Sequence, residues 1–372
     1  MIKYCRNCLL PNTKPYIKFD IDNICSACDL HFSKKFKKKI SINWKKRNKE
    51  FLKVINKIKS LKSPFYDVCV PVSGGKDSIS QIHYLLNKGL RILAVNIDYG
   101  IKTEIGNYNL NLIPLMGVNL ITYRPNLKLQ KKVIKIGFEK YGDPDLMSHC
   151  LLHAYPIRVA IQYKIPLVLH GENSAYEYSG DINFKERNFD SKWFEKYAAN
   201  KGMTPKKFAK KHKINYRDLS VYDLPNKNDL KKTKVYFTSY FFKWSGEINL
   251  KIAKKYGFKT LKKPREGTYR NYVGIDEKIN RIHQFIKLLK FGYGRATDHA
   301  CEDIRNKKIS REQGIKLVLK HDRKKLSNYF INDFIKFISI SSKSFHSTLK
   351  KFTNKKIWNK KNKKPLKNFN FI

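Results

Sequence analysis

Six consecutive residues have the types and the order that bind a phosphate group: Ser73, Gly74, Gly75, Lys76, Asp77 and Ser78. The two glycines let the backbone come close to an anion, and the lysine supplies a positive charge suited to phosphate oxygens. The two serines can donate hydroxyl hydrogen bonds, and the aspartate can hold a magnesium ion that bridges phosphate oxygens. The stretch is not a Walker A loop, which has four residues between its first glycine and Gly-Lys-[Ser/Thr]. We therefore predict a phosphate-binding loop of another kind, called the phosphate loop below. A turn with incidental glycines is the alternative.

The segments around the phosphate loop have the patterns of a strand and a helix. An apolar run at residues 66–70 precedes the loop, and residues 79–86 have helical spacing. A strand, a glycine turn and a helix start bring free backbone N–H groups and the positive end of a helix dipole to one point. This context supports the prediction of a phosphate site.

Two CxxC pairs near the N-terminus contain four of the seven cysteines: Cys5, Cys8, Cys25 and Cys28. The sixteen residues between the pairs give the spacing of a four-thiolate zinc site in a small ribbon. Roughly thirty residues cannot bury a core of their own, so a ribbon of this length depends on its metal. We predict a structural Zn²⁺ ion. An iron–sulfur or redox centre is one alternative, and a site without metal is another.

Length and hydropathy point to a cytoplasmic enzyme. The chain has 372 residues, enough for about two or three domains. No apolar run approaches the ~18 residues of a membrane span, and the N-terminus enters the first cysteine pair without a signal-peptide core.

The net charge of +48 suggests a nucleic-acid partner at first sight, because 78 basic residues face 30 acidic ones. The lysines, however, are spread over every segment and accompany abundant asparagine and isoleucine. Such a uniform excess is typical of a compositional bias rather than a binding stripe. Nucleic acid is therefore an unlikely partner, and acidic sugar nucleotides or anionic surfaces are alternatives.

Strand and helix patterns alternate after the phosphate loop. Apolar runs at residues 91–98, 120–123 and 166–170 are separated by helical stretches. This alternation predicts an α/β fold with a parallel sheet covered on both faces. Ligands of such sheets lie beyond the carboxyl ends of the strands. Asp98, Gly171 and Glu172 follow predicted strands there and are candidates for ligand binding. The alternative for each is a structural role alone.

The rest of the chain divides by composition. A late stretch at residues 290–299 is rich in glycine and polar groups, and it either places Arg295, Asp298 and His299 in the site or forms a self-satisfied capped turn. A lysine run at residues 34–39 either contacts phosphate or nucleic acid or is a solvated helix face. The predicted regions are a zinc ribbon (1–31), a basic connecting helix (32–65), a core that contains the phosphate loop (66–173), an aromatic-rich insertion or lid (174–245), a helical region (246–325) and a basic tail (326–372).

Taken together, these motifs resemble the N-acetyl sugar amidotransferase family of the PP-loop ATP pyrophosphatases. The resemblance covers about residues 1–325. It rests on the CxxC pairs, SGGKDS, the strand end VNIDYG, the segment HGEN and the stretch FGYGRATDHACEDIR. Members of the family install acetamidino groups on surface sugars such as pseudaminic, legionaminic or diacetamido-uronic acids, in lipopolysaccharide biosynthesis or flagellin glycosylation.

The resemblance implies a PP-loop core, in which ATP with Mg²⁺ adenylates an amide oxygen and releases pyrophosphate. Ammonia would come from a glutaminase subunit, with or without a cyclase-like companion. The acceptor would be an N-acetylated sugar or a sugar nucleotide. The catalytic residues would be Lys76, Asp77, Glu172 and Asp298. The nucleotide site would comprise Ser73, Gly74, Gly75, Lys76, Asp77, Ser78, Asp98 and Gly171.

The alternative is a tRNA 2-thiolation enzyme, which also combines CxxC pairs with a PP-loop. Such enzymes resemble this chain less, because a further CxxC is replaced here by Cys150 and His153. A second metal site of Cys150, His153 and Cys301 remains an open alternative. A zinc-ribbon nucleic-acid adaptor without catalysis would leave the phosphate loop unexplained.

Overall fold

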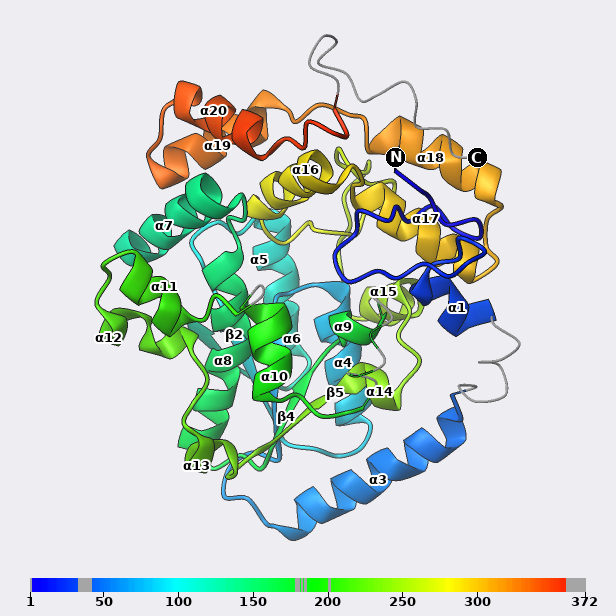
Figure 1. Ribbon diagram of the computed structural model, residues 1–372. Helices are drawn as coiled ribbons and strands as arrows, with labels where there is room; N and C mark the ends of the chain where they lie inside the picture. Colours follow the sequence, from blue (N-terminus) through cyan, green and yellow to red (C-terminus); the bar gives the residue numbers. More distant parts are fainter. Residues whose placement is uncertain are drawn as a thin grey trace.

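The computed structural model describes residues 2–32, 42–177, 181, 183, 186–199 and 202–358. At its centre lies a five-stranded parallel sheet in the order β3-β2-β1-β4-β5 (Figure 1). The strands are β1 (Val68–Val72), β2 (Ile92–Ile97), β3 (Asn119–Tyr123), β4 (Leu167–His170) and β5 (Lys234–Phe237). The chain leaves the central β1 toward β2 and β3, and then returns to add β4 and β5 on its other side. The predicted parallel α/β fold is confirmed.

Both faces of the central strands are buried, because successive side chains point to opposite sides. Cys69 of β1 packs with Leu93 and Val95 of β2 in one core cluster, whereas Val68 and Val70 pack in another. Strands that are buried on both faces need continuous apolar runs, which explains the patterns in the sequence.

Helices cover the two faces in a three-layer arrangement. One face is covered by α3 (Trp44–Ser60), α4 (Lys76–Leu86), α5 (Glu104–Leu110), α6 (Leu112–Leu115) and α15 (Gly246–Lys254). The other is covered by α7 (Leu127–Ile136), the π-helical turn η1 (Gly137–Tyr141), α8 (Leu146–Gln162) and α16 (Ile279–Phe291). In the described parts of the chain, no helix has the length and apolar character needed to cross a membrane.

The segment predicted as an insertion, residues 174–245, contributes β5 to the edge of the sheet. Its aromatic residues Phe189, Trp193 and Phe194 are buried in the core beneath α8, whereas Tyr178 and Phe184 lie outside the described residues. Its helices are short: α9 (Ser174–Glu177), α10 (Ser191–Trp193), η3 (Phe194–Ala198), α11 (Pro205–Lys211), α12 (Tyr216–Leu219), η4 (Ser220–Tyr222), α13 (Lys227–Leu230) and α14 (Thr238–Phe241).

The C-terminal region is helical, as predicted, and comprises α16, α17 (Arg295–Arg305), α18 (Arg311–His321), α19 (Asn328–Ile338) and α20 (Ser342–Phe352). Ser310 caps α18 in a capping box. The last two helices lie in the segment expected to be a basic tail, and they pack beside α16 and α7 (Figure 1). Their apolar faces place Phe334 and Phe345 against Phe138 of η1. Residues 359–372 and the lysine run at 34–39 are outside the described residues.

The N-terminal ribbon, residues 2–32, packs on the C-terminal helices. Isolated bridges join Tyr4 to Pro11 and Phe19 to Cys25, and α1 (Ser26–Phe32) follows. Leu9 of the ribbon shares a buried cluster with Ile304 of α17 and Val318 of α18. The ribbon is thus anchored on segments almost 300 residues away in the sequence.

Candidate active site

The phosphate loop lies between the end of β1 and the start of α4. Gly74 has φ +86°, and a Cβ atom there would come within 2.9 Å of the Gly106 carbonyl oxygen. Gly75 is the N-cap of α4 and provides no side-chain cap. Its amide donates to the Ser73 hydroxyl at 3.2 Å, and the Ser73 amide donates to the Ser78 hydroxyl at 3.1 Å. The loop therefore needs glycine for its shape, and it leaves the N-terminus of α4 without a side-chain cap, as an anion site requires.

Lys76 and Asp77 form an ion pair at the first turn of α4, with Nζ 2.7 Å from Oδ2. Asn249 of α15 donates to the other Asp77 oxygen at 2.7 Å and accepts from Ser80 at 3.1 Å. The Lys76 ammonium also lies 5.4 Å from the ring centre of Tyr272. Asn249 and Tyr272 are site residues that the sequence reasoning missed, because they belong to later segments with no motif.

A cavity of about 910 Å³ opens in front of the loop. It lies beyond the carboxyl ends of β1 and β4, where the chain reverses its direction across the sheet. In open parallel sheets this switch point is the usual place for ligands. Ala27 of the ribbon, Arg47 of α3 and residues of α8, α15, α16 and α17 complete the walls.

The charge of the cavity differs from that of the chain. Seven acidic and six basic residues line it, whereas the whole chain has 30 acidic and 78 basic residues. The lysine excess is therefore outside the cavity, which is consistent with a compositional bias. A nearly balanced wall suits a ligand that combines anionic and neutral polar groups.

Gly171 and Glu172, which follow β4, both line the cavity. A Cβ atom on Gly171 would lie 3.4 Å from the Trp244 ring, so the indole packs directly on this backbone. Gln81 of α4 donates to the Leu169 carbonyl at 2.8 Å and to Thr238 at 2.6 Å, which ties α4 to the end of β4. The helix that follows the phosphate loop and the end of β4 are thus held together by a buried amide.

Asp98 follows β2 as predicted, but it does not line the cavity. Arg124 donates to its Oδ2 through Nε at 3.0 Å, and the Gly100 amide donates to Oδ1 at 2.9 Å. Burial alone would raise the pKa of Asp98, but these partners hold it below its usual value. Its predicted contact with a nucleotide remains a prediction.

Asp298 of α17 lines the cavity, in a helix where the sequence suggested an irregular stretch. Lys287 of α16 forms an ion pair with it, and Arg295 Nη1 lies 3.8 Å away. Burial alone would raise the pKa of Asp298, but these cations keep it below its usual value. Asp298 therefore presents a fixed negative charge rather than an exchangeable proton. His299, the next residue, also lines the cavity, and its Nδ1 lies 3.1 Å from the Thr268 hydroxyl.

The N-terminus of α17 is held by Asp322, a buried residue that ends α18. Its carboxylate accepts the amides of Gly294, Ala296 and Thr297 at 2.9, 2.9 and 3.0 Å. A carboxylate that accepts several amides at a helix N-terminus is a strong cap. α17 is thereby fixed where it forms one wall of the cavity.

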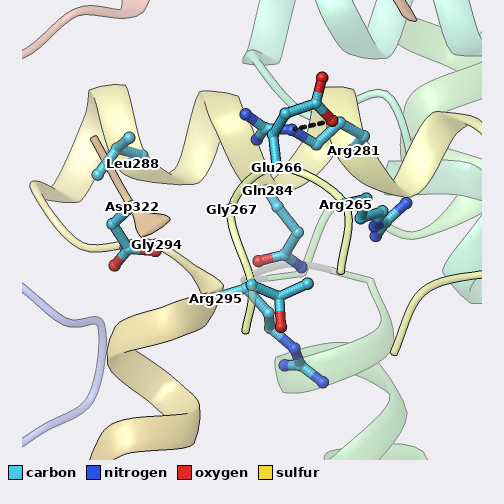
Figure 2. Close-up of a pocket in the computed structure, with 10 residues that line it drawn as sticks. Arg265, Glu266, Gly267, Arg281, Gln284, Leu288, Gly294, Arg295 and Asp322 are labelled. Carbon is cyan, nitrogen blue, oxygen red and sulfur yellow. Dashed lines mark hydrogen bonds and ion pairs between the residues drawn. The ribbon is translucent and has the colours of Figure 1, made fainter. Parts of the chain in front are cut away.

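Figure 2 shows a second, much smaller pocket behind this wall, between the loop at residues 265–268 and α16. Its volume of about 10 Å³ is no more than a single water needs. Arg281 Nε lies 3.9 Å from Glu266 Oε2 there, and Gln284 and Arg295 line both this pocket and the large cavity. The contacts in this pocket orient residues that also line the large cavity, and the pocket itself has no room for a substrate.

The four ribbon cysteines are buried and their sulfur atoms lie within 4.8 Å of one another. The Sγ atoms of Cys8 and Cys25 are 3.7 Å apart. Tetrahedral zinc with Zn–S bonds of about 2.3 Å separates its sulfurs by roughly 3.8 Å, so the donor set fits Zn²⁺. The Cys25 amide donates to Cys5 Sγ at 3.2 Å, and Arg305 Nη1 lies 4.0 Å from Cys8 Sγ. These donors offset the negative charge of four thiolates.

The other cysteines do not join this centre or form a second one among the described residues. Cys150 lies against the Ala198 carbonyl in the core cluster that includes α8, whereas Cys301 accepts a hydrogen bond from the Leu9 amide in the cluster of the ribbon. His153 packs instead against His170 and Trp193. The second metal site considered above is therefore not formed.

The fold and the site define a parallel α/β protein with a phosphate-type loop at its switch point and a four-cysteine centre that fits zinc. Residues 266–371 match the family described as LPS biosynthesis protein WbpG-like, C-terminal domain. This match includes the α17 wall and extends through the segment expected to lie outside the family resemblance. NMN synthetase from Francisella tularensis is 14% identical, over 51% of this chain and 91% of that chain, with a TM-score of 0.27. Among curated proteins, none matches this sequence.

Proposed function

We propose that this chain is an ATP-dependent amidotransferase that forms AMP and pyrophosphate and converts the N-acetyl group of a bacterial surface sugar to an acetamidino group. The observation that carries the proposal is the phosphate loop opening onto a large cavity whose α17 wall belongs to the segment similar to an LPS biosynthesis family. The sugar is of the nonulosonic or diacetamido-uronic type, either free or nucleotide-linked.

The chemistry explains why such an enzyme needs ATP. An amide carbon is a poor electrophile and its oxygen is a poor leaving group, so ammonia does not displace it unaided. Transfer of AMP to the amide oxygen gives an O-adenylyl imidate, from which AMP leaves readily. The phosphate loop and Lys76 would hold the β and γ phosphates, and Asp77 would hold Mg²⁺, which neutralises the charge on the departing pyrophosphate.

A separate glutaminase would supply the ammonia. All seven cysteines are buried, so among the described residues no thiol is presented as the nucleophile of a glutaminase site. A tRNA thiolation enzyme would use further cysteines for catalysis or for an iron–sulfur cluster, and among the described residues no cysteine outside the four-cysteine centre is exposed or part of a second cluster. A cavity with nearly balanced charge also suits an acidic sugar better than a polynucleotide.

The test is pyrophosphate release with ATP, Mg²⁺, ammonium chloride and N-acetylated nonulosonic or UDP-linked diacetamido-uronic acids as candidate acceptors. Lys76→Ala and Asp77→Asn should each lower the rate at least about a hundredfold, since each removes a charge that acts in the transition state. The exposed Lys45→Ala is the matched control and should be unaffected. Pyrophosphate release that requires tRNA, or AMP formation unaltered in both loop variants, would refute the proposal.

A further inference from the structure

Half of the histidines of the chain, five of ten, line the large cavity. They are His149, His153, His170, His283 and His299. The first two lie one turn apart on α8, so they face the same side of that helix. The proposed transfer of AMP uses none of these five imidazoles.

Two carboxylates meet His283 at one part of this wall. His283 Nδ1 lies 3.3 Å from Asp143 Oδ1 and 3.3 Å from Asp145 Oδ2. The ring of His149 is centred 6.0 Å from that of His283. Asp145, His149 and His283 line the cavity, whereas Asp143 stands behind them. We call these four residues the carboxylate–histidine cluster.

The backbone holds this cluster in place. The Asp145 amide donates to Asp143 Oδ1 at 3.1 Å. Gly142 has φ +58°, and a Cβ atom there would lie 2.6 Å from the Phe352 ring of α20. Lys290 of α16 donates to the Tyr141 carbonyl at 3.1 Å. The segment at residues 141–145 is therefore held by α16 and α20 on the side away from the cavity. Binding sites are normally built on rigid elements of this kind.

The imidazoles of His153 and His170 also line the cavity. His170 is only 4% exposed and its Nε2 has no hydrogen-bond partner among the described residues. The His153 ring is centred 5.0 Å away, and its Nδ1 also has no such partner. Burial lowers the pKa of His170 to about 3, so both acceptor and donor capacity of a neutral imidazole are present. Buried nitrogens of this kind normally have a partner, which points to a polar ligand in the cavity.

The charges of the cluster select a small cation. Burial alone would lower the pKa of His283, but the two carboxylates raise it above its usual value. Two carboxylates with one imidazolium leave an excess of negative charge. Of the nearby lysines of α16, Lys287 pairs with Asp298, and the charge of Lys290 acts on Asp143, where it lowers the pKa. The charged groups that shift the pKa of Asp145 are His283, His149 and Asp143. Burial also raises the pKa of Asp145, which makes it a better base than an exposed carboxylate.

We propose that Asp145 and His149 bind the ammonium ion, that His283 and Asp143 hold the Asp145 carboxylate in place, and that this carboxylate takes the ammonium proton. Ammonium gives one proton to Asp145, and the freed electron pair forms a C–N bond with the imidate carbon. A second proton moves to the imidate nitrogen, the C–O bond breaks, and AMP leaves with that electron pair. The product is an amidinium.

The inference rests on the proposed function, but its first test needs neither ATP nor acceptor. ¹⁵N-labelled ammonium chloride is titrated into the full chain, and the broadening of the ammonium NMR signal gives the affinity. Asp145→Asn should weaken binding at least about tenfold, because a hydrogen bond to a charged group is worth that much. His149→Asn should weaken it as well. Asp218→Asn and His346→Asn alter exposed residues elsewhere and should leave binding unchanged.

Two results would overturn the inference: binding that survives in both cluster variants, or binding that potassium chloride abolishes as effectively as unlabelled ammonium does. Once an acceptor is known, Asp145→Asn should raise the KM for ammonium and leave pyrophosphate release in the first step intact. Loss of pyrophosphate release in every form of the protein would count against the proposed function instead. Ammonium binding measured in the absence of ATP would then still stand.

Discussion

At the scale of single residues, the acidic groups of this very basic chain are held by specific partners. Asp77 has Lys76 and Asn249, and Asp98 has Arg124. Outside the site, Asp67 before β1 accepts from the Arg91 amide and Nη2, each at 2.8 Å. A surface with a large lysine excess offers many weak pairings, so it is burial and geometry that make these few specific.

Asp67→Asn should lower the midpoint of thermal unfolding by a few degrees at neutral pH. Burial alone would raise the pKa of Asp67, but the hydrogen bonds and charge of Arg91 hold it below its usual value. A lowered carboxyl pKa stabilises the folded state above the unfolded pKa of about 3.9, and this stabilisation is lost as the pH falls through the folded pKa. Thermal unfolding of both proteins across pH should show the difference shrink below about pH 4. A difference that grows on acidification would contradict this pairing.

At the scale of elements, the strand–loop–helix unit at the phosphate loop depends on the backbone of Gly74. Its positive φ and the 2.9 Å approach to the Gly106 carbonyl act together. Gly117 has a similar φ of +81°, and a Cβ atom there would meet nothing within 4 Å. The two glycines separate the cost of backbone conformation from the cost of a steric clash.

Gly117→Ala should cost about 1 to 2 kcal/mol of unfolding free energy, the penalty of a left-handed non-glycine residue. Gly74→Ala should cost more and should also abolish nucleotide-dependent pyrophosphate release, because the clash moves the loop. Denaturant unfolding and the pyrophosphate assay measure the two effects. Equal destabilisation and equal activity in the two variants would show that the close contact is unimportant.

The helices α19 and α20 form part of the folded structure, and Phe352 of α20 packs on Gly142 beside the carboxylate–histidine cluster. Phe345 is 0% exposed, and its ring stacks on Phe138 with centroids 5.4 Å apart. Phe345→Ala should therefore lower the free energy of unfolding by about 3 to 5 kcal/mol. His346→Ala, at the exposed neighbouring position, should change it by less than about 0.5 kcal/mol. Urea unfolding curves decide the matter, and similar values for both variants would mean that α20 is dispensable.

At the scale of the whole molecule, the cavity belongs to no single segment. The ribbon contributes Ala27, the connecting helix Arg47, and the C-terminal region the α17 wall. Because Leu9 packs with Ile304 of α17 and Arg305 lies near Cys8, the ribbon supports a helix that lines the site. The four-cysteine centre is therefore coupled to the cavity through packing.

Cys5→Ser should release zinc and lower the thermal midpoint, because metal binding supplies much of the folding energy of a small ribbon. Cys69→Ser is the matched control, since Cys69 is buried in β1 away from the ribbon. That control should lose stability while keeping its metal. Elemental analysis with thermal unfolding separates the two outcomes. Full zinc content in Cys5→Ser would exclude the four-thiolate centre.

Local sequence patterns predicted the residues of the phosphate loop and of the cysteine centre more readily than the residues that contact them in the folded structure. The phosphate loop, the parallel sheet and the cysteine centre depend on short-range spacing and on apolar runs, which the chain displays directly. The stretch at residues 290–299 was harder, because its glycines and polar groups hide the cap that Asp322 provides. The segment after residue 325 was misleading, since its many lysines obscure two amphipathic helices.

By itself the sequence determined which strand carries the phosphate loop, which thiols can share a metal, and that the sheet is parallel, because each follows from residues close together in the chain. Only the tertiary structure decided that Asp98 lies outside the cavity. It also decided that Asp143 and Asp145 lie close to His283, a residue of α16 that is more than a hundred positions further along the chain. Such meetings depend on how helices pack around the sheet. Packing is a property of whole surfaces, and no short spacing in the chain records it.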